Sequence, residues 1–147
     1  MKKALSSILI CASLLLPFSS SAFAEKGYAD SKETAVELTA EKLGGRIQQK
    51  VGYLDYQDSD FYKFTNKTGS TIVAVFVLDS SVSFINYDIR AYFPNGDILT
   101  GKDEGAGKKD AIYDVKLRPG EVIYLEVKGH TARDFGKDAP YHIYVIV

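Results

Sequence analysis

From residue 46 to the end of the chain, apolar side chains recur at every second position in short runs that are separated by turn residues. A period of two is typical of a β-strand with one buried face. The runs are 47–54, 61–65, 72–78, 85–93, 97–100, 111–117, 123–127 and 141–147. We expect Asn95-Gly96 to supply the positive φ angles of a hairpin turn and Pro119-Gly120 to form a type II turn. Strands of this number and spacing favour an all-β sandwich of about eight strands.

The first 24 residues have the pattern of a cleavable secretory signal. Lys2 and Lys3 precede a largely apolar stretch, and residues 22–24 have the small-x-small form that signal peptidase accepts. The stretch is short and interrupted by serines, which disfavours a membrane anchor. Cys11 lies midway in it, after Ile10, which disfavours a lipid-anchored cysteine. We therefore expect a bacterial secreted protein, extracellular or associated with the cell wall, whose single domain spans residues 25–147.

Removal of the signal would take away the one cysteine of the chain, so the domain is expected to fold without a disulfide. Loss of Lys2 and Lys3 from the 18 basic side chains leaves 16 against 19 acidic ones, a net charge of −3. A mildly acidic chain gives no support for binding of nucleic acid or of an anionic membrane. No second long apolar segment follows the signal.

Residues 25–45 show the weakest strand pattern in the domain. Asp30 followed by Glu33 resembles a helix N-cap with its capping box, so one or two helical turns are expected here, ending at Gly44-Gly45. An extended, ordered lead-in and a mobile stub are the alternatives.

Taken in order, several pieces of the chain resemble the bacterial pre-peptidase C-terminal domain family, which includes the collagen-binding domains of secreted collagenases. The pieces are residues 30–35, 58–64, 88–96, 124–129 and 141–145, and together they extend over nearly the whole domain. The resemblance implies an antiparallel, jelly-roll-like β-sandwich. It also implies a domain that accompanies protease domains and binds matrix or assists secretion. No catalytic domain is present in this sequence, so the module is expected to act alone.

The resemblance also implies a possible calcium site, formed by Asp30, Asp58 and Asp60 with Asp55 nearby. Calcium prefers oxygen ligands, and a cation relieves the repulsion among clustered carboxylates. The chain departs from the family pattern at residues 27–29, where Gly, Tyr and Ala stand in place of the Glu and Asn ligands of calcium-binding relatives. The alternative is that Asp58 and Asp60 only cap a turn.

Tyrosine is the second candidate feature, with ten tyrosines and no tryptophan in the chain. Side chains of this type on an outward sheet face suit contact with a protein or a sugar. On the strand 123–127 the outward positions are Tyr124, Glu126 and Lys128, and two of these are charged, unlike the tyrosine-rich face of collagen binders. The candidate ligand-binding residues are Tyr87, Tyr92, Tyr113, Tyr124 and Tyr144. The alternative is that these tyrosines only fill strands and sandwich rims.

Catalytic patterns are scarce. The sequence contains no Gly-x-Ser-x-Gly element and no paired metal-binding spacing of histidine or cysteine, and its two histidines are His130 and His142. We expect a non-enzymatic binding module that recognises an extracellular protein or polysaccharide through an aromatic sheet face. The alternative is an accessory or inhibitory partner of a co-secreted protease, and a small hydrolase is the third hypothesis.

Overall fold

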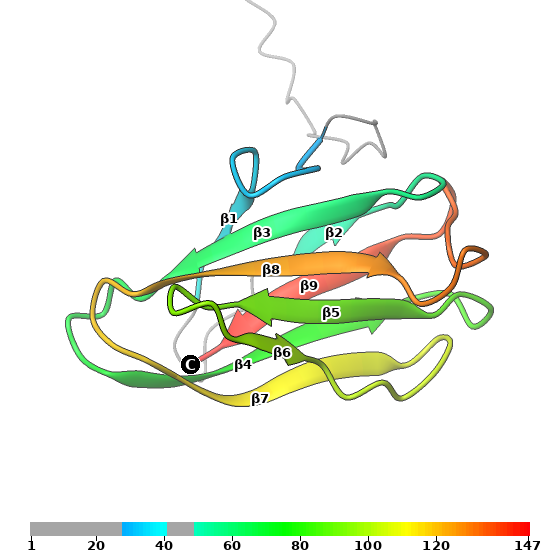
Figure 1. The fold of residues 1–147 in the computed structure, drawn as a ribbon. Coiled ribbons are helices and arrows are strands. Elements are labelled where there is room, and N and C mark those ends of the chain that lie inside the picture. Colours follow the sequence, from blue (N-terminus) through cyan, green and yellow to red (C-terminus); the bar gives the residue numbers. More distant parts are fainter. Residues whose placement is uncertain (1–27, 41–48) are drawn as a thin grey trace, which may run out of the picture.

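The computed structural model describes residues 28–40 and 49–147, and all regular elements in these ranges are β-strands. The predicted signal, Cys11, Ile47 and the expected end of a helix at Gly44-Gly45 lie outside them. Nine strands form two facing sheets (Figure 1). Their bounds are β1 Val36–Leu38, β2 Lys50–Gly52, β3 Ser59–Thr65, β4 Ile72–Ser80, β5 Tyr87–Tyr92, β6 Ile98–Thr100, β7 Lys109–Leu117, β8 Val122–Gly129 and β9 Tyr141–Ile146. This confirms the predicted all-β sandwich.

The five-stranded sheet has the order β1-β3-β8-β5-β6, and the four-stranded sheet has the order β2-β9-β4-β7. From β3 to β9 the chain passes from one sheet to the other at every connection except the β5–β6 hairpin. These crossings place β8 between β3 and β5, and β4 between β7 and β9, as Figure 1 shows. No helix in the described ranges has the length and apolarity that crossing a membrane requires.

Inward side chains of the two sheets form one core, because burial alternates along the strands. In β8, for example, Ile123, Leu125 and Val127 are fully buried while the residues between them are half-buried. Phe64 of one sheet meets Phe76 of the other with ring centroids 5.6 Å apart, and edge-to-face contact is a favourable geometry for such a pair. The period of two predicted from the sequence therefore matches the alternation of side chains between the buried and the outer face of each sheet.

The N-terminal lead-in is extended, and the expected helix is wrong for the residues described. Val36–Leu38 instead pairs in parallel with residues 62–64 of β3. Ser31 and Thr34 close a local turn, in which the Thr34 amide donates to the Ser31 carbonyl at 3.2 Å. The helix-like pattern at Asp30–Glu33 thus marks one turn, after which the chain covers the free edge of β3 and pairs its backbone groups.

Two turns test the predicted turn chemistry. Gly120 has φ +77°, which the predicted type II turn at Pro119-Gly120 requires at this position. In the β5–β6 hairpin, only Gly96 has a positive φ, at +90°, so the expectation that Asn95 shares it is wrong. The Gly96 amide donates to the Phe93 carbonyl at 3.0 Å, and the Phe93 amide to the Asp97 carbonyl at 2.9 Å. The connection is therefore a three-residue loop that ends in a left-handed glycine.

Candidate functional site

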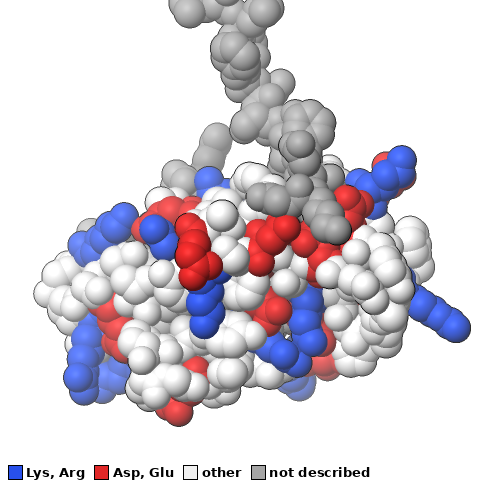
Figure 2. Space-filling view, turned by 45° about the horizontal axis from the view of Figure 1, so that its top comes forward, with Lys and Arg blue, Asp and Glu red and all other residues white. Residues whose placement is uncertain are grey.

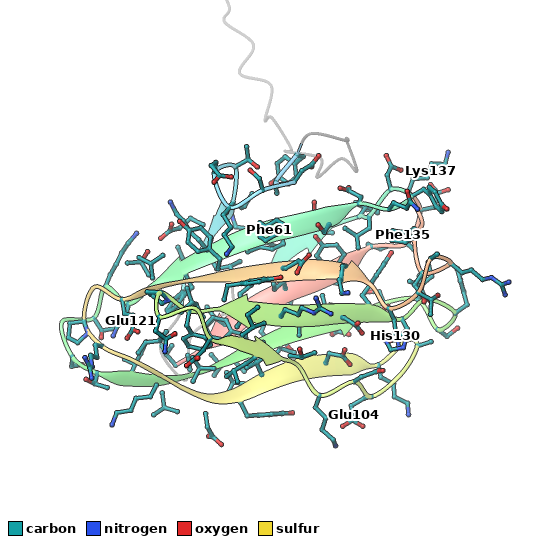
Figure 3. The ribbon with its side chains drawn as sticks, viewed as in Figure 1. Phe61, Glu104, Glu121, His130, Phe135 and Lys137 are labelled. Carbon is teal, nitrogen blue, oxygen red and sulfur yellow. The ribbon has the colours of Figure 1, made fainter. Side chains whose placement is uncertain are left out.

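The outer face of the five-stranded sheet carries a pair of neighbouring tyrosines. Tyr92 of β5 and Tyr124 of β8 are direct cross-strand partners, and both are half-buried on the side away from the core. Phe61 of β3 lies on the same face, with its ring centroid 6.2 Å from that of Tyr92 (Figure 3). We call Phe61, Tyr92 and Tyr124 the aromatic patch. Two of the five tyrosines proposed from the sequence therefore lie together on one surface.

A basic side chain from the lead-in covers the aromatic patch. The Nζ atom of Lys32 is 4.2 Å from the ring centroid of Tyr92 and 5.8 Å from that of Tyr124. Both distances are within the range of a cation–π interaction. Beside the two rings is a hollow of about 400 Å³, lined by Lys32, Tyr92, Phe93, Pro94, Val122 and Tyr124. The patch therefore combines ring faces with a depression next to them.

One carboxylate belongs to the same surface. The Tyr92 hydroxyl donates to Oε2 of Glu126 at 2.5 Å, and Glu126 is the cross-strand partner of Arg90. Burial, followed by the hydrogen bond to Glu126, raises the pKa of Tyr92, so the phenol stays neutral. On the face seen in Figure 2, acidic and basic side chains are interspersed among wide uncharged areas. The surface therefore does not present one sign of charge to a ligand.

The other three candidate tyrosines lie elsewhere. Tyr87 is only 2% exposed, and its hydroxyl donates to the Ala139 carbonyl at 2.9 Å inside the core, so its proposed place on a binding surface is wrong. Burial raises its pKa to about 12. Tyr113 is 61% exposed but belongs to β7 in the other sheet. Tyr144, on the outer face of that other sheet, is 7% exposed and packs with Val77 and Ala111.

The acidic residues proposed from the sequence do come together. One carboxylate oxygen each from Asp30, Asp58 and Asp60 lies within 4.8 Å of the others. The Phe61 amide donates to the Ala29 carbonyl at 2.6 Å, which ties the lead-in, and with it Asp30, to β3. Asp58 precedes β3 in a turn in which its amide donates to the Asp55 carbonyl at 3.1 Å. We call Asp30, Asp58 and Asp60 the acidic triad.

The environment of Asp58 and Asp60 disfavours negative charge. Burial, with Asp58 and Asp30 close by, raises the pKa of Asp60 to about 7 although a hydrogen bond from Tyr141 opposes the shift. Burial and the neighbouring Asp30 also raise the pKa of Asp58. Asp60 points into the core, where the Tyr141 hydroxyl donates to its Oδ2 and lies 2.8 Å from the Tyr62 hydroxyl. A cation at the triad would remove the repulsion between the carboxylates, which adds to the effect of burial on these pKa values.

The geometry of the triad is compatible with calcium. Two oxygens bound to one calcium at about 2.3–2.6 Å lie at most about 5 Å apart, and the triad's oxygens meet that condition. Calcium needs about six to eight ligands, so water and carbonyl oxygens would have to complete the set. Asp55, named from the sequence as a neighbour, is close enough to Asp58 to raise its pKa.

A third group of polar residues was not predicted from the sequence. His130, which follows β8, has its Nδ1 3.0 Å from Oδ1 of Asp88 and 3.5 Å from Oδ2 of Asp103 (His130 is labelled in Figure 3). The hydrogen bond that the His130 ring donates to Asp88 is the main cause of a raised pKa for His130. The three residues come from distant segments, and their spacing matches no known motif. Within the described ranges the His130 ring contacts carboxylates and no hydroxyl nucleophile, which is an ion-pair arrangement.

Comparisons with known proteins bear on the fold. No family model and no curated protein matches this chain. Among solved structures, the pre-peptidase C-terminal domain of a collagenase from Bacillus anthracis is similar, with a TM-score of 0.52 and 19% sequence identity. The match covers 74% of this chain and 95% of that one. This supports the resemblance inferred from the sequence and shows that the chain has the fold of such a domain.

Proposed function

We propose that this chain is a secreted, non-enzymatic binding module of the pre-peptidase C-terminal type, which recognises an extracellular protein or polysaccharide through its aromatic patch. The observation that carries the proposal is the pairing of Tyr92 with Tyr124 on an outer sheet face, next to Phe61 and a hollow. Aromatic rings are enriched at binding surfaces because they supply large apolar contact with a polar end. The fold supports it, since the similar structure is a domain of a collagenase.

Binding to insoluble material tests the proposal. We expect saturable co-sedimentation of the protein with collagen fibrils or with purified cell wall, and a loss of at least about tenfold in affinity when Tyr92 and Tyr124 are both changed to Ala. Tyr113→Ala is the matched control, because Tyr113 is also an exposed strand tyrosine but belongs to the other sheet. Equal binding by both variants and the wild type, or no binding to any such material by folded protein, would contradict the proposal.

The second candidate is an accessory or inhibitory partner of a co-secreted protease. The observation in its favour is that the similar structure is itself a domain of a protease, the collagenase. This function predicts a one-to-one complex with such a protease in size-exclusion chromatography and little affinity for polymers. The aromatic patch would then contact the protease, and the same pair of tyrosine changes would abolish the complex.

We further propose that the acidic triad binds calcium and thereby holds the lead-in on β3. Asp30 belongs to the lead-in, whereas Asp58 and Asp60 belong to the turn before β3 and to β3 itself, so one ion would join the two segments. Calcium bound only by the folded form raises the melting temperature by mass action. We expect such a rise in millimolar calcium relative to chelator, abolished in Asp58→Asn and retained in Asp103→Asn. A melting temperature that is the same in calcium and in chelator would contradict the calcium site.

A further inference from the structure

The aromatic patch already holds a cation in the isolated chain, and this points to the chemistry of its ligand. We infer that Tyr92 and Tyr124 form a binding site for a lysine side chain of a protein partner, and that Lys32 occupies this site until the partner displaces it. The inference rests on the proposed function and deepens it, because it selects a protein over a polysaccharide and names the group that the rings recognise.

The first support is the position of the Lys32 ammonium. Its Nζ lies 4.2 Å from the ring centroid of Tyr92 and 5.8 Å from that of Tyr124, so Tyr92 makes the closer contact. Attraction between a cation and the electron-rich face of a ring falls off beyond about 6 Å. Among the described residues Lys32 forms no ion pair, although its charge acts on the adjacent Glu33 carboxylate, and the two rings are what its ammonium contacts.

The second support is the electron supply to the Tyr92 ring. The Tyr92 hydroxyl donates to the Glu126 carboxylate at 2.5 Å, and donation to an anion increases the electron density of the phenol ring. A richer ring face attracts a cation more strongly. The negative charge of Glu126 acts in the same direction. Tyr92, Tyr124 and Glu126 together have the composition of a site for an organic cation.

The third support is the partnering of the other basic residues nearby. Lys63 is the cross-strand neighbour of Tyr124, but its Nζ lies 3.4 Å from Glu37, with which it forms an ion pair. Arg90 lies opposite Glu126 in the register of β5 and β8, and it interacts with Tyr92 through the hydroxyl group. Lys32, by contrast, is exposed and lies in the local turn that Ser31 and Thr34 close, so its side chain can rotate away without moving a strand.

The preference for a protein partner follows from the present occupant. Lys32 reaches the rings from the lead-in, a polypeptide segment attached at the edge of β3, and a lysine of a bound peptide could present its ammonium to the rings in the same way. The hollow beside the rings is lined by Phe93, Pro94 and Val122, which suit the aliphatic stem of such a side chain. A neutral sugar could stack on the rings, but it carries no charge and so could not form the cation–π interaction.

Two short peptides test the inference by NMR titration of the protein. The first is an end-blocked glycine-lysine-glycine peptide, and the second replaces lysine with norleucine, which has a similar stem and no charge. We expect the lysine peptide alone to shift the resonances of Tyr92 and Tyr124. Lys32→Gln removes the competing ammonium, so affinity for the lysine peptide should rise by about two- to fivefold. Lys63→Gln, which removes a paired lysine nearby, should leave affinity within twofold.

Ring variants complete the test. Tyr124→Ala should abolish the shifts at Tyr92, while Tyr124→Phe, which keeps the ring face, should retain them. Equal shifts with the two peptides, or no gain in Lys32→Gln, would overturn the inference, and so would tighter binding of a neutral oligosaccharide when Lys32 is removed. If the protein binds matrix through its tyrosines and ignores the lysine peptide, the inference fails while the proposed function stands. The reverse result, in which the lysine peptide shifts the tyrosine resonances but no insoluble material is bound, would support the lysine site and exclude insoluble matrix and cell wall as its ligands.

Discussion

At the scale of single residues, Asp60 has the most unusual environment in the described part of the chain. Its side chain is buried beside Tyr141 and Tyr62, and burial is the main cause of its raised pKa. The sequence pointed to Asp60 through its place in an acidic turn. It did not indicate that the carboxylate faces inward, because the hydrogen bond from Tyr141 joins residues 81 positions apart.

The raised pKa of Asp60 predicts how stability depends on pH. Its value is about 7 in the folded state against 3.8 for an unperturbed Asp, so between these values the folded chain keeps a proton that the unfolded chain releases. This contribution to stability is complete below about pH 4, is lost as the pH rises towards 7, and is absent above. The Asp60→Asn variant has no titrating group at this position. In the presence of chelator, the melting temperature of the variant minus that of the wild type should therefore increase from pH 4 to pH 8.

The size of this effect is on the order of a few kcal/mol, as expected for a shift of several pKa units. Thermal melts at fixed ionic strength across the pH range measure it. Asp103→Asn is a suitable control, because the pKa of Asp103 is lowered by a hydrogen bond from Asn86, so its pH dependence has the opposite sign. A difference between Asp60→Asn and the wild type that stays constant from pH 4 to 8 would contradict the assignment.

Tyr141→Phe should destabilise the protein by about 1–3 kcal/mol, because it removes a buried donor from the Asp60 carboxylate. The loss should increase as the pH rises through 7, since a hydrogen bond to an ionised group is stronger than one to its neutral form. Tyr87→Phe removes a buried hydroxyl that donates to the neutral carbonyl of Ala139, so its cost should not vary with pH. Urea unfolding at pH 6 and pH 8 compares the two, and parallel behaviour would argue against a titrating Asp60.

At the scale of elements, the eight runs of alternating apolar residues all correspond to strands, with ends displaced by a few positions. The period of two was sufficient because each strand has one face on the shared core. It could not reveal β1, which is three residues long and depends on the free edge of β3 for its pairing. The same alternation places Tyr87 with Ile89 on the inward face, so its assignment to a surface patch overlooked the strand period.

Two of the three glycines in the loop between β6 and β7, Gly105 and Gly107, differ in their surroundings. Both have positive φ, +94° at Gly105 and +70° at Gly107. A Cβ at Gly105 would meet nothing within 4 Å, whereas one at Gly107 would lie 2.5 Å from the Cα of Ser83. The Gly107 amide donates to the Ile85 carbonyl at 3.1 Å and fixes the loop against the β4–β5 connection.

Alanine substitution of these glycines should therefore have unequal effects. Gly105→Ala should cost about 1 kcal/mol, because only backbone strain opposes it. Gly107→Ala should cost several times as much, since the backbone of Ser83 must also move. Urea midpoints of the two variants measure the difference. Equal costs would mean that the loop is not packed against residues 82–85.

At the scale of the whole molecule, the division of the strands between two sheets determines which candidate residues can act together. Tyr92 and Tyr124 meet because β5 and β8 are neighbours, while Tyr113 and Tyr144 are carried by the other sheet. Strand order depends on contacts between distant segments, and alternation along one strand carries no information about it. The acidic triad was anticipated because the family resemblance supplied what local patterns lack, a pairing of the lead-in with the turn before β3.

The central claim is that ligand binds on the outer face of the five-stranded sheet, at the aromatic patch. The most direct measurement is amide NMR line broadening across the whole domain. The ligand added is a soluble fragment of whichever matrix protein the domain co-sediments with. The account predicts broadening centred on Phe61, Tyr92 and Tyr124, with Tyr113 and its strand unaffected. Broadening centred on β4, β7 and β9, with the aromatic patch unchanged, would contradict it.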